Sequence, residues 1–257
     1  MKHKRAVLTL TCLIFVVVCV LSLYKLFSVA EIKVNYSVYN ENVEEVESIL
    51  SKYKNKSIFF ISEKEIEREI TSNRYLKVLS VKKEYPCTIV VELAERGERY
   101  ALKTSNGWYF LDDEFFAVRS SAESSSLRGE KLTLVSFYDV SGEEMPQDCT
   151  LKQVFSFPDV TNENVREMLK LLGDTGENMN EIRFVFTPEK GNYRILLYSV
   201  EGVVIEIQKA GEFGERKLAA GIEYYKNLPV ERKMRGKILV NRLDSGEISC
   251  VHTPSGD

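Results

Sequence analysis

The sequence predicts a mixed α+β protein whose globular part follows an N-terminal apolar helix. The first observation behind this prediction is a run without charge from Val7 to Leu23. The second is a module of about 65 residues, a common size for a small domain, in which a strand precedes two helices and two strands. The third is a longer region rich in short apolar strands, with two helices. The chain has 257 residues and is 44% hydrophobic, which suffices for two globular cores.

The charge balance argues against nucleic acid as a partner. The net charge is -3, and basic residues are interspersed with acidic ones along the chain. The adjacent Lys82 and Lys83 are therefore interpreted as a solvated strand face rather than a patch that binds phosphates.

The apolar N-terminal run predicts a membrane helix. With the following residues to Phe27 it reaches the roughly 20 residues that a helix needs to cross a bilayer. Lys2, Lys4 and Arg5 precede it, so the positive-inside rule places the N-terminus in the cytoplasm. We predict a short cytoplasmic tail at 1–5, a transmembrane helix at 6–27, and an extracytoplasmic remainder.

A cleaved signal peptide is the alternative, because Ser28, Val29 and Ala30 resemble a small-x-small cleavage site. The apolar run is longer than the roughly 7 to 15 residues of a signal core, and Lys25 lies between the core and the site. These features favour an uncleaved anchor. On either interpretation the remainder is exported.

Three cysteines follow the apolar helix: Cys87, Cys149 and Cys250. Their odd number and irregular spacing do not suit a disulfide framework. We expect three thiols, with one bridge among them at most.

The first module begins with an alternating strand at 32–39 and a helix at 43–53 with apolar residues at helical spacing. Ser62 is predicted to cap a second helix, and Glu65 would complete a capping box. That helix is expected to end near Asn73.

Two strands, at 78–85 and 88–95, complete the module and are joined by Pro86 and Cys87. Proline fixes its own φ and restricts Tyr85 to extended geometry, so this position fits a turn between strands.

The second module starts near Arg99 and contains a hairpin centred on Asp112 and Asp113. A helix is predicted from Thr161 to Gly173, because apolar residues recur there at helical spacing. The remaining predicted elements are strands at 133–140, 182–186, 194–200 and 203–208, a helix at 215–228, and a hairpin at 237–251.

The residues give little support to catalysis. The only two histidines are His3 and His252, so acid-base or triad chemistry outside the membrane would depend on His252 alone. Cys250 and His252 would share one side of a strand, but a metal site needs more ligands than this pair. Asp112 and Asp113 favour a turn over a catalytic pair, because neighbouring carboxylates on a strand point apart.

The segment from Gly211 to Gly214 follows a strand and opens a helix, as a phosphate-binding loop does. Glu212 and Glu215, however, bring negative charge to the helix N-terminus, where they suit the helix dipole and repel phosphate. A turn with an acidic first helical turn is the favoured interpretation.

The last predicted strand, from Glu247 to Val251, is followed by six residues. It could lie at the edge of its sheet, where it could accept a strand from another chain. It could equally be paired on both sides within the sheet.

At this point the residues resemble a known family. The stretch from Lys54 to Leu102 is similar to the POTRA module of the bacterial division proteins FtsQ and DivIB. The matching positions are Ile58, Phe59, Ile61, Ile66, Val78, Val81, Tyr85, Pro86, Thr88, Ile89, Val91, Glu95, Arg96 and Ala101. The segments 109–118, 203–228 and 238–251 resemble the beginning and end of that family's β domain, and 120–180 matches loosely.

The resemblance implies a POTRA domain (β-α-α-β-β) at 28–97, a β-rich domain with two helices at 98–252, and a C-terminal tail at 253–257. It implies a non-enzymatic, single-pass division protein of the cell membrane, expected at the septum, without cofactor or metal. Such a protein joins FtsL-type and DivIC/FtsB-type partners outside the membrane and helps regulate septal peptidoglycan synthesis. The residues that the resemblance assigns to partner binding are Tyr224, Tyr225, Leu243, Ser245, Glu247, Ile248, Ser249, Cys250 and Val251.

Core packing is an equally good interpretation for Tyr224 and Tyr225.

Two other functions of the protein stay open. One is a POTRA-bearing export or assembly factor, although such proteins commonly repeat the module or add a membrane barrel. The other is an exported hydrolase anchored near the wall, which the shortage of histidine disfavours.

Overall fold

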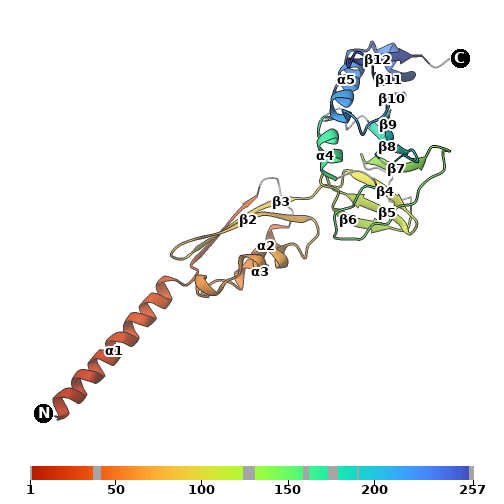
Figure 1. The fold of residues 1–257 in the computed structure, drawn as a ribbon. Helices are drawn as coiled ribbons and strands as arrows, with labels where there is room; N and C mark the ends of the chain where they lie inside the picture. Colours follow the sequence, from red (N-terminus) through yellow and green to blue (C-terminus); the bar gives the residue numbers. More distant parts are fainter. Residues whose placement is uncertain are drawn as a thin grey trace. The chain divides into compact units, whose positions relative to one another are not determined.

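The computed structural model describes residues 2–36, 42–123, 131–158, 162–172, 179–189 and 191–254, with side chains from Leu10 onward. The chain divides into two compact units, Met1–Arg96 and Gly97–Asp257. Figure 1 shows the elements of both units in chain order, and each unit is described by itself below.

The first unit begins with the long helix α1, Lys2–Leu26. Within the described part of the chain, no helix combines the length and the apolar character that a membrane crossing requires. The transmembrane helix predicted at 6–27 is therefore not found among the described residues.

A three-stranded sheet forms one layer of this unit. Its order is β1 (Glu31–Tyr36), β3 (Thr88–Glu95) and β2 (Leu76–Glu84). β3 is parallel to β1 and antiparallel to β2. The predicted turn at Pro86 joins β2 to β3, and its Tyr85–Pro86 peptide bond is cis. Positions 37–39 of the strand predicted at 32–39 lie outside the described residues.

Helices α2 (Val43–Ser51) and α3 (Glu63–Ile70) and the short 3-10 helix η1 (Ile58–Phe60) complete the unit. Their apolar faces and the sheet share one core. The predicted capping box is wrong: Ser62 stands at the N-cap, but its side chain makes no capping hydrogen bond. Its backbone carbonyl instead accepts from the N–H of Glu65 at 3.1 Å.

The second unit is built on one nine-stranded sheet, with order β12-β11-β10-β9-β8-β7-β4-β5-β6. The strands are β4 (Tyr100–Thr104), β5 (Gly107–Leu111), β6 (Ala117–Ser121), β7 (Thr133–Asp139), β8 (Met179–Phe186), β9 (Tyr193–Ser199), β10 (Val203–Ile207), β11 (Gly236–Arg242) and β12 (Ile248–Thr253). All strands predicted for this region are confirmed, and β4 is an additional one.

Three of the ladders are parallel: β4 with β7, β7 with β8, and β10 with β11. Helix α4 (Asn162–Lys170) lies between β7 and β8 in the chain, and α5 (Gly214–Asn227) lies between β10 and β11. A third, four-residue helix, α6 (Val230–Lys233), corrects the prediction of two helices. It follows Pro229, whose fixed φ favours a helix start. The sequence offers Thr161 or Asn162 as the cap of α4 and Gly173 as its end; Asn162 is the first residue of the helix, and positions 161 and 173 lie outside the described residues.

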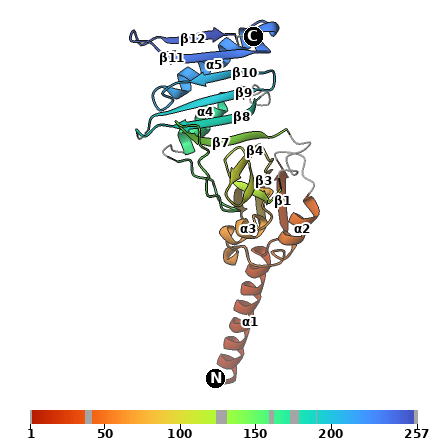
Figure 2. The same cartoon turned by 90° about the vertical axis from the view of Figure 1, so that its right-hand side faces the viewer.

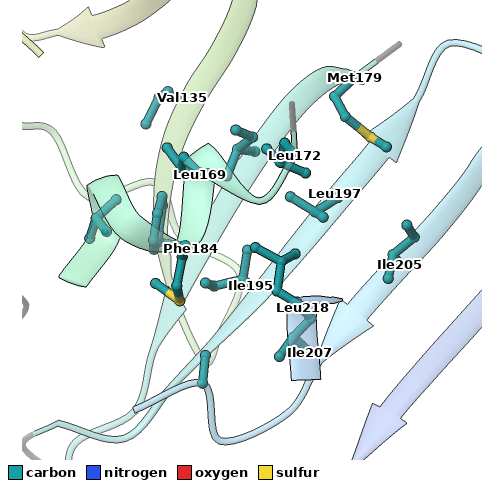
Figure 3. Close-up of a cluster of buried hydrophobic side chains, with 14 of the residues drawn as sticks. Val135, Leu169, Leu172, Met179, Phe184, Ile195, Leu197, Ile205, Ile207 and Leu218 are labelled. Carbon is teal, nitrogen blue, oxygen red and sulfur yellow. The ribbon is translucent and has the colours of Figure 1, made fainter. Parts of the chain in front are cut away.

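The core of the second unit lies between α4, α5 and the sheet. Figure 3 shows Leu169 of α4, Leu172 just after that helix and Leu218 of α5 directed toward the strands. They meet alternate residues of β8, β9 and β10, because successive side chains of a strand point to opposite faces. The residues of these three strands that are labelled there are Met179, Phe184, Ile195, Leu197, Ile205 and Ile207.

Candidate partner interface

The last strand, β12, ends the nine-stranded sheet. Among the described residues it pairs with β11 and with no other strand. Figure 2 shows β12 as the outermost strand at that end of the sheet. Of the two arrangements that the sequence allowed, the structure therefore has the edge position, in which one row of backbone N–H and C=O groups faces away from the sheet.

The register shows which backbone groups face outward. The N–H of Leu243 donates to the carbonyl of Glu247 at 2.8 Å, so these two residues form a hydrogen-bonded pair at the hairpin end. Hydrogen-bonded and non-hydrogen-bonded pairs alternate along an antiparallel ladder. Ile248, Cys250 and His252 occupy the non-hydrogen-bonded pairs with β11. Their N–H and C=O groups therefore point to the free edge.

The side chains of β12 divide between two faces. Ile248 and Cys250 are half-buried and pack against the core on the side of α5, where Tyr224 is also partly buried. Burial raises the pKa of the Cys250 thiol above its ordinary value, and the nearby Glu223 adds to this effect. Ser249 and Val251 alternate with them on the opposite face, and Val251 is 53% exposed.

The second tyrosine of α5 belongs to the core. Tyr225 is 3% exposed, and its hydroxyl donates to Oε2 of Glu201 at 2.7 Å. Burial, together with this hydrogen bond, raises the pKa of Tyr225 to about 12. Tyr225 is thus a core residue, whereas Tyr224 is only partly buried.

The hairpin turn carries the remaining predicted residues. Leu243 is 49% exposed, and the N–H of Gly246 donates to its carbonyl at 2.8 Å. The N–H of Glu247 reaches Oγ of Ser245 at 3.4 Å. These contacts fix the turn, so the side chains of Leu243 and Glu247 are presented to solvent on a defined backbone.

One surface feature beside the edge was not predicted. The guanidinium of Arg242, at the end of β11, lies 4.3 Å from the ring centre of Phe213, which is 46% exposed. Phe213 stands in the left-handed region, with φ of 56°, immediately before α5. The signal available in the sequence was an aromatic residue within an otherwise polar, glycine-bounded turn, and such a residue is often held at the surface for a contact.

Helix α5 forms the support beneath the edge and contacts β10, β11 and β12. Lys217 is 1% exposed, and its Nζ donates to the carbonyls of Gln208 and Lys209 at 3.0 and 2.9 Å. Burial lowers the pKa of this ammonium group. The lysine thereby ties the start of the helix to the end of β10.

An ion-pair cluster joins β9, β10 and β11 on the sheet. Glu206 has a side chain that is 2% exposed; it contacts Arg194 at 3.3 Å and also Lys237. Burial by itself raises the pKa of Glu206, but Lys237 and Arg194 outweigh it and hold the pKa below its ordinary value. The cluster fixes the strand that pairs with β12.

The other candidate groups have structural surroundings. Oδ1 of Asp112 accepts from the N–H groups of Glu114 and Phe116, at 2.8 Å each, as expected for a turn. The three cysteines after α1 are free thiols. Within the described ranges, no three His, Cys, Asp or Glu side chains are grouped closely enough to hold a metal ion. Before α5 the predicted turn is found, with Glu215 in the first helical turn, beside a cavity of about 470 Å³.

Comparison with known proteins adds one finding. The family model described as "POTRA domain, FtsQ-type" matches residues 27–96. Residues 27–96 form a POTRA domain of the FtsQ type. The match confirms the recognition made from the sequence and supports an FtsQ/DivIB-family POTRA protein. No curated protein matches the chain.

The match covers the first unit and indicates a division-associated POTRA protein. FtsQ-type POTRA proteins form a non-enzymatic scaffold family whose members act through contacts with other proteins. The fold of the POTRA domain agrees with the match, because β1, α2, α3, β2 and β3 follow one another in the expected β-α-α-β-β order.

Proposed function

We propose that this protein is a scaffold of the bacterial division machinery that binds FtsL-type and DivIC/FtsB-type partners outside the membrane and helps regulate septal peptidoglycan synthesis. The FtsQ-type POTRA match supports the division role. The observation that supports partner binding is the free edge of β12. There the backbone N–H and C=O groups of three alternate residues, Ile248, Cys250 and His252, face away from the sheet. An extended segment of a partner would add as a tenth strand.

The side chains beside this edge would select the partner. Tyr224, Ile248 and Cys250 are partly buried apolar residues on the side of α5. Leu243 and Val251 are each about half exposed. A partner strand with apolar residues at alternate positions would place them on one of these faces, because side chains on the same face of paired strands contact one another.

We also propose that residues 6–27 anchor the chain in the membrane, with the N-terminus in the cytoplasm and both units outside. This proposal rests on the uncharged sequence from Val7 to Leu23 and on the exposure of apolar side chains along α1. Phe15 is 68% exposed and Leu21 is 63% exposed, so the globular part of the first unit does not bury them.

A proline placed at an outward-facing position tests the edge. Cys250→Pro removes an N–H that faces the free edge, and an edge strand tolerates proline at such a position. Cys250→Ala is the matched control, because it removes the thiol and keeps the N–H. The measurement is the affinity of the full chain in detergent for the extracytoplasmic segments of FtsL-type and DivIC-type proteins.

We expect Cys250→Pro to weaken binding by about 5- to 150-fold, equivalent to the roughly 1–3 kcal/mol that an unmade backbone hydrogen bond costs. Cys250→Ala is expected to bind within about twofold of wild type. Equal affinity for the proline and alanine variants would place the partner elsewhere. Absence of binding by the wild type would contradict the division scaffold itself.

A further inference from the structure

The first unit exposes an aromatic patch beside the end of α1, which we define as Phe59, Phe60 and Tyr85. Phe60 is 89% exposed, and Phe59 and Tyr85 are 55% and 59% exposed. The rings of Phe59 and Tyr85 lie 5.6 Å apart between centres, although they come from η1 and from the β2–β3 turn. Aromatic side chains gathered at such exposure on a folded domain mark a contact surface.

The fold holds these rings outward. Ile58 and Ile61, on either side of the two phenylalanines, are 0% and 5% exposed and belong to the core of the first unit. With both neighbours buried, the backbone of η1 directs Phe59 and Phe60 away from the core. Tyr85 is fixed in the same way, because it lies in the tight turn that joins two paired strands.

The patch is joined directly to α1. The ring of Phe27 lies 4.8 Å from that of Phe59, and Phe27 continues α1 through a hydrogen bond from its N–H to the carbonyl of Leu23. The N–H of Ile58 donates to the carbonyl of Phe27 at 2.8 Å, and the N–H of Val29 donates to that of Lys56 at 2.9 Å. Within the first unit, the patch therefore has a fixed place next to the last turn of the helix.

The apolar surface of α1 continues into the patch. Tyr24 and Leu26, in the last turn of the helix, are both 54% exposed. Lys25 lies between them in the sequence, and Lys56 lies two residues before η1. Aromatic rings with lysines beside them, at the end of an apolar helix, are the composition of the boundary between lipid headgroups and acyl chains.

We propose that the aromatic patch inserts into the outer headgroup boundary of the membrane and seats the POTRA domain on the bilayer surface. The occupant is lipid, because the patch continues the exposed apolar surface of α1. Glu84, the last residue of β2, directly precedes Tyr85, so the rings rather than net positive charge supply the attraction. The inference rests on the proposed membrane anchor, and it adds a second contact between the chain and the bilayer.

A depth measurement tests the proposal. The full chain carries Trp108→Phe in every variant, so that one introduced tryptophan provides the fluorescence. Phe60→Trp places it in the patch. Leu79→Trp is the control, because Leu79 is an exposed apolar residue of the same domain, 50% exposed on β2. At about 3.3 Å per residue, it lies roughly 20 Å along the strand from Tyr85.

Both variants are reconstituted into vesicles of phosphatidylcholine and phosphatidylglycerol that contain lipid with a nitroxide at a shallow acyl carbon. We expect quenching of the Phe60→Trp fluorescence to exceed that of Leu79→Trp by at least about threefold, because only the patch would reach the boundary. Flotation of the vesicles at alkaline pH measures the anchor separately.

The outcomes separate the two proposals. Chains that float with the vesicles and show selective quenching at position 60 support the aromatic patch. Chains that float with equal, weak quenching in both variants overturn the patch and leave the anchor, and they indicate a protein as the occupant. Chains that do not float overturn the anchor and, with it, the seating of the POTRA domain.

Discussion

Gly221 offers a sharp test of how α5 packs against the strands that support β12. It lies in the buried face of the helix, above β10 and β11. A Cβ at this position would stand 2.9 Å from Cγ2 of Val240 and 3.1 Å from Cγ2 of Ile205. Ordinary contact begins at 3.4 Å, so the two approaches are short by about 0.5 and 0.3 Å. Both neighbours are 0% exposed and belong to the packed core of the second unit.

Two opposing effects decide the result of Gly221→Ala. Alanine favours a helix interior over glycine by about 1 kcal/mol. Extra volume in a packed core costs about 1–3 kcal/mol. With two short approaches onto buried methyl groups, we expect the packing cost to exceed the helical gain and the variant to lose about 1 kcal/mol of unfolding free energy.

The assay uses the single tryptophan of the chain, Trp108, which lies on β5 and reports on the second unit. Urea unfolding of the full chain in detergent gives the unfolding free energy from the fluorescence transition. Ala219→Gly is the matched control, because Ala219 lies in the same helix and is exposed. It is expected to lose about 1 kcal/mol through helix propensity alone. A gain in stability by Gly221→Ala would refute the packing described here.

Three further predictions concern titrating groups near the interface. The pKa of Tyr225 is raised to about 12, so the folded protein keeps this phenol neutral above pH 10. The unfolding free energy is therefore lost as pH rises from 10 toward 12. Tyr225→Phe should remove this part of the loss in urea titrations followed by Trp108 fluorescence. The pKa of Glu206 is held below its ordinary value of 4.5, so its ion pairs with Lys237 and Arg194 stabilise the fold above that pH. This stabilisation is lost as pH falls. In the same assay, the unfolding free energy of Glu206→Gln should decrease less steeply with falling pH than that of wild type. Lys217→Met removes the Nζ donor from two partly buried backbone carbonyls, of which that of Lys209 keeps the N–H of Glu212 as a donor. We expect the unfolding free energy to fall by about 1 kcal/mol or more, whereas an unchanged urea midpoint would contradict the hydrogen bonds assigned to Nζ.

Local patterns predicted most of the elements. The apolar runs at 88–95 and 203–207 are strands because their β-branched residues pack on a pleated surface, and Pro86 lies in a turn because it cannot donate to a ladder. Leu218 and Ile222 are buried, as their helical spacing indicated. These features depend on residues a few positions apart, which the sequence displays directly.

Long-range pairing was outside the reach of such patterns. β4 pairs with β7 across two intervening strands of the chain, and nothing in either segment specifies the other. The same reason left the position of β12 open, because an edge and an inner strand can have the same half-apolar pattern. At Ser62 the residue types of a capping box are present, but the side-chain hydrogen bond depends on a rotamer that composition does not fix.

The candidate interface was predicted in part. The hairpin turn at Ser245 and Gly246 and the strand that follows were expected from their residues. The roles of the adjacent tyrosines were not separated, because both fit an apolar face of α5. Their different exposure follows from where the helix meets β11 and β12, which depends on the packing of the whole unit.

The single sheet of the second unit has a mechanical consequence. The chain enters this sheet at β4, and a partner strand at β12 would sit at one end of it. A lateral pull between these points therefore crosses every ladder from β4 to β12. β4 and β7 are joined at three paired positions, against six between β7 and β8. Under tension we expect the sheet to part first between β4 and β7, so that the strands next to the partner stay folded after the entry hairpin has torn away.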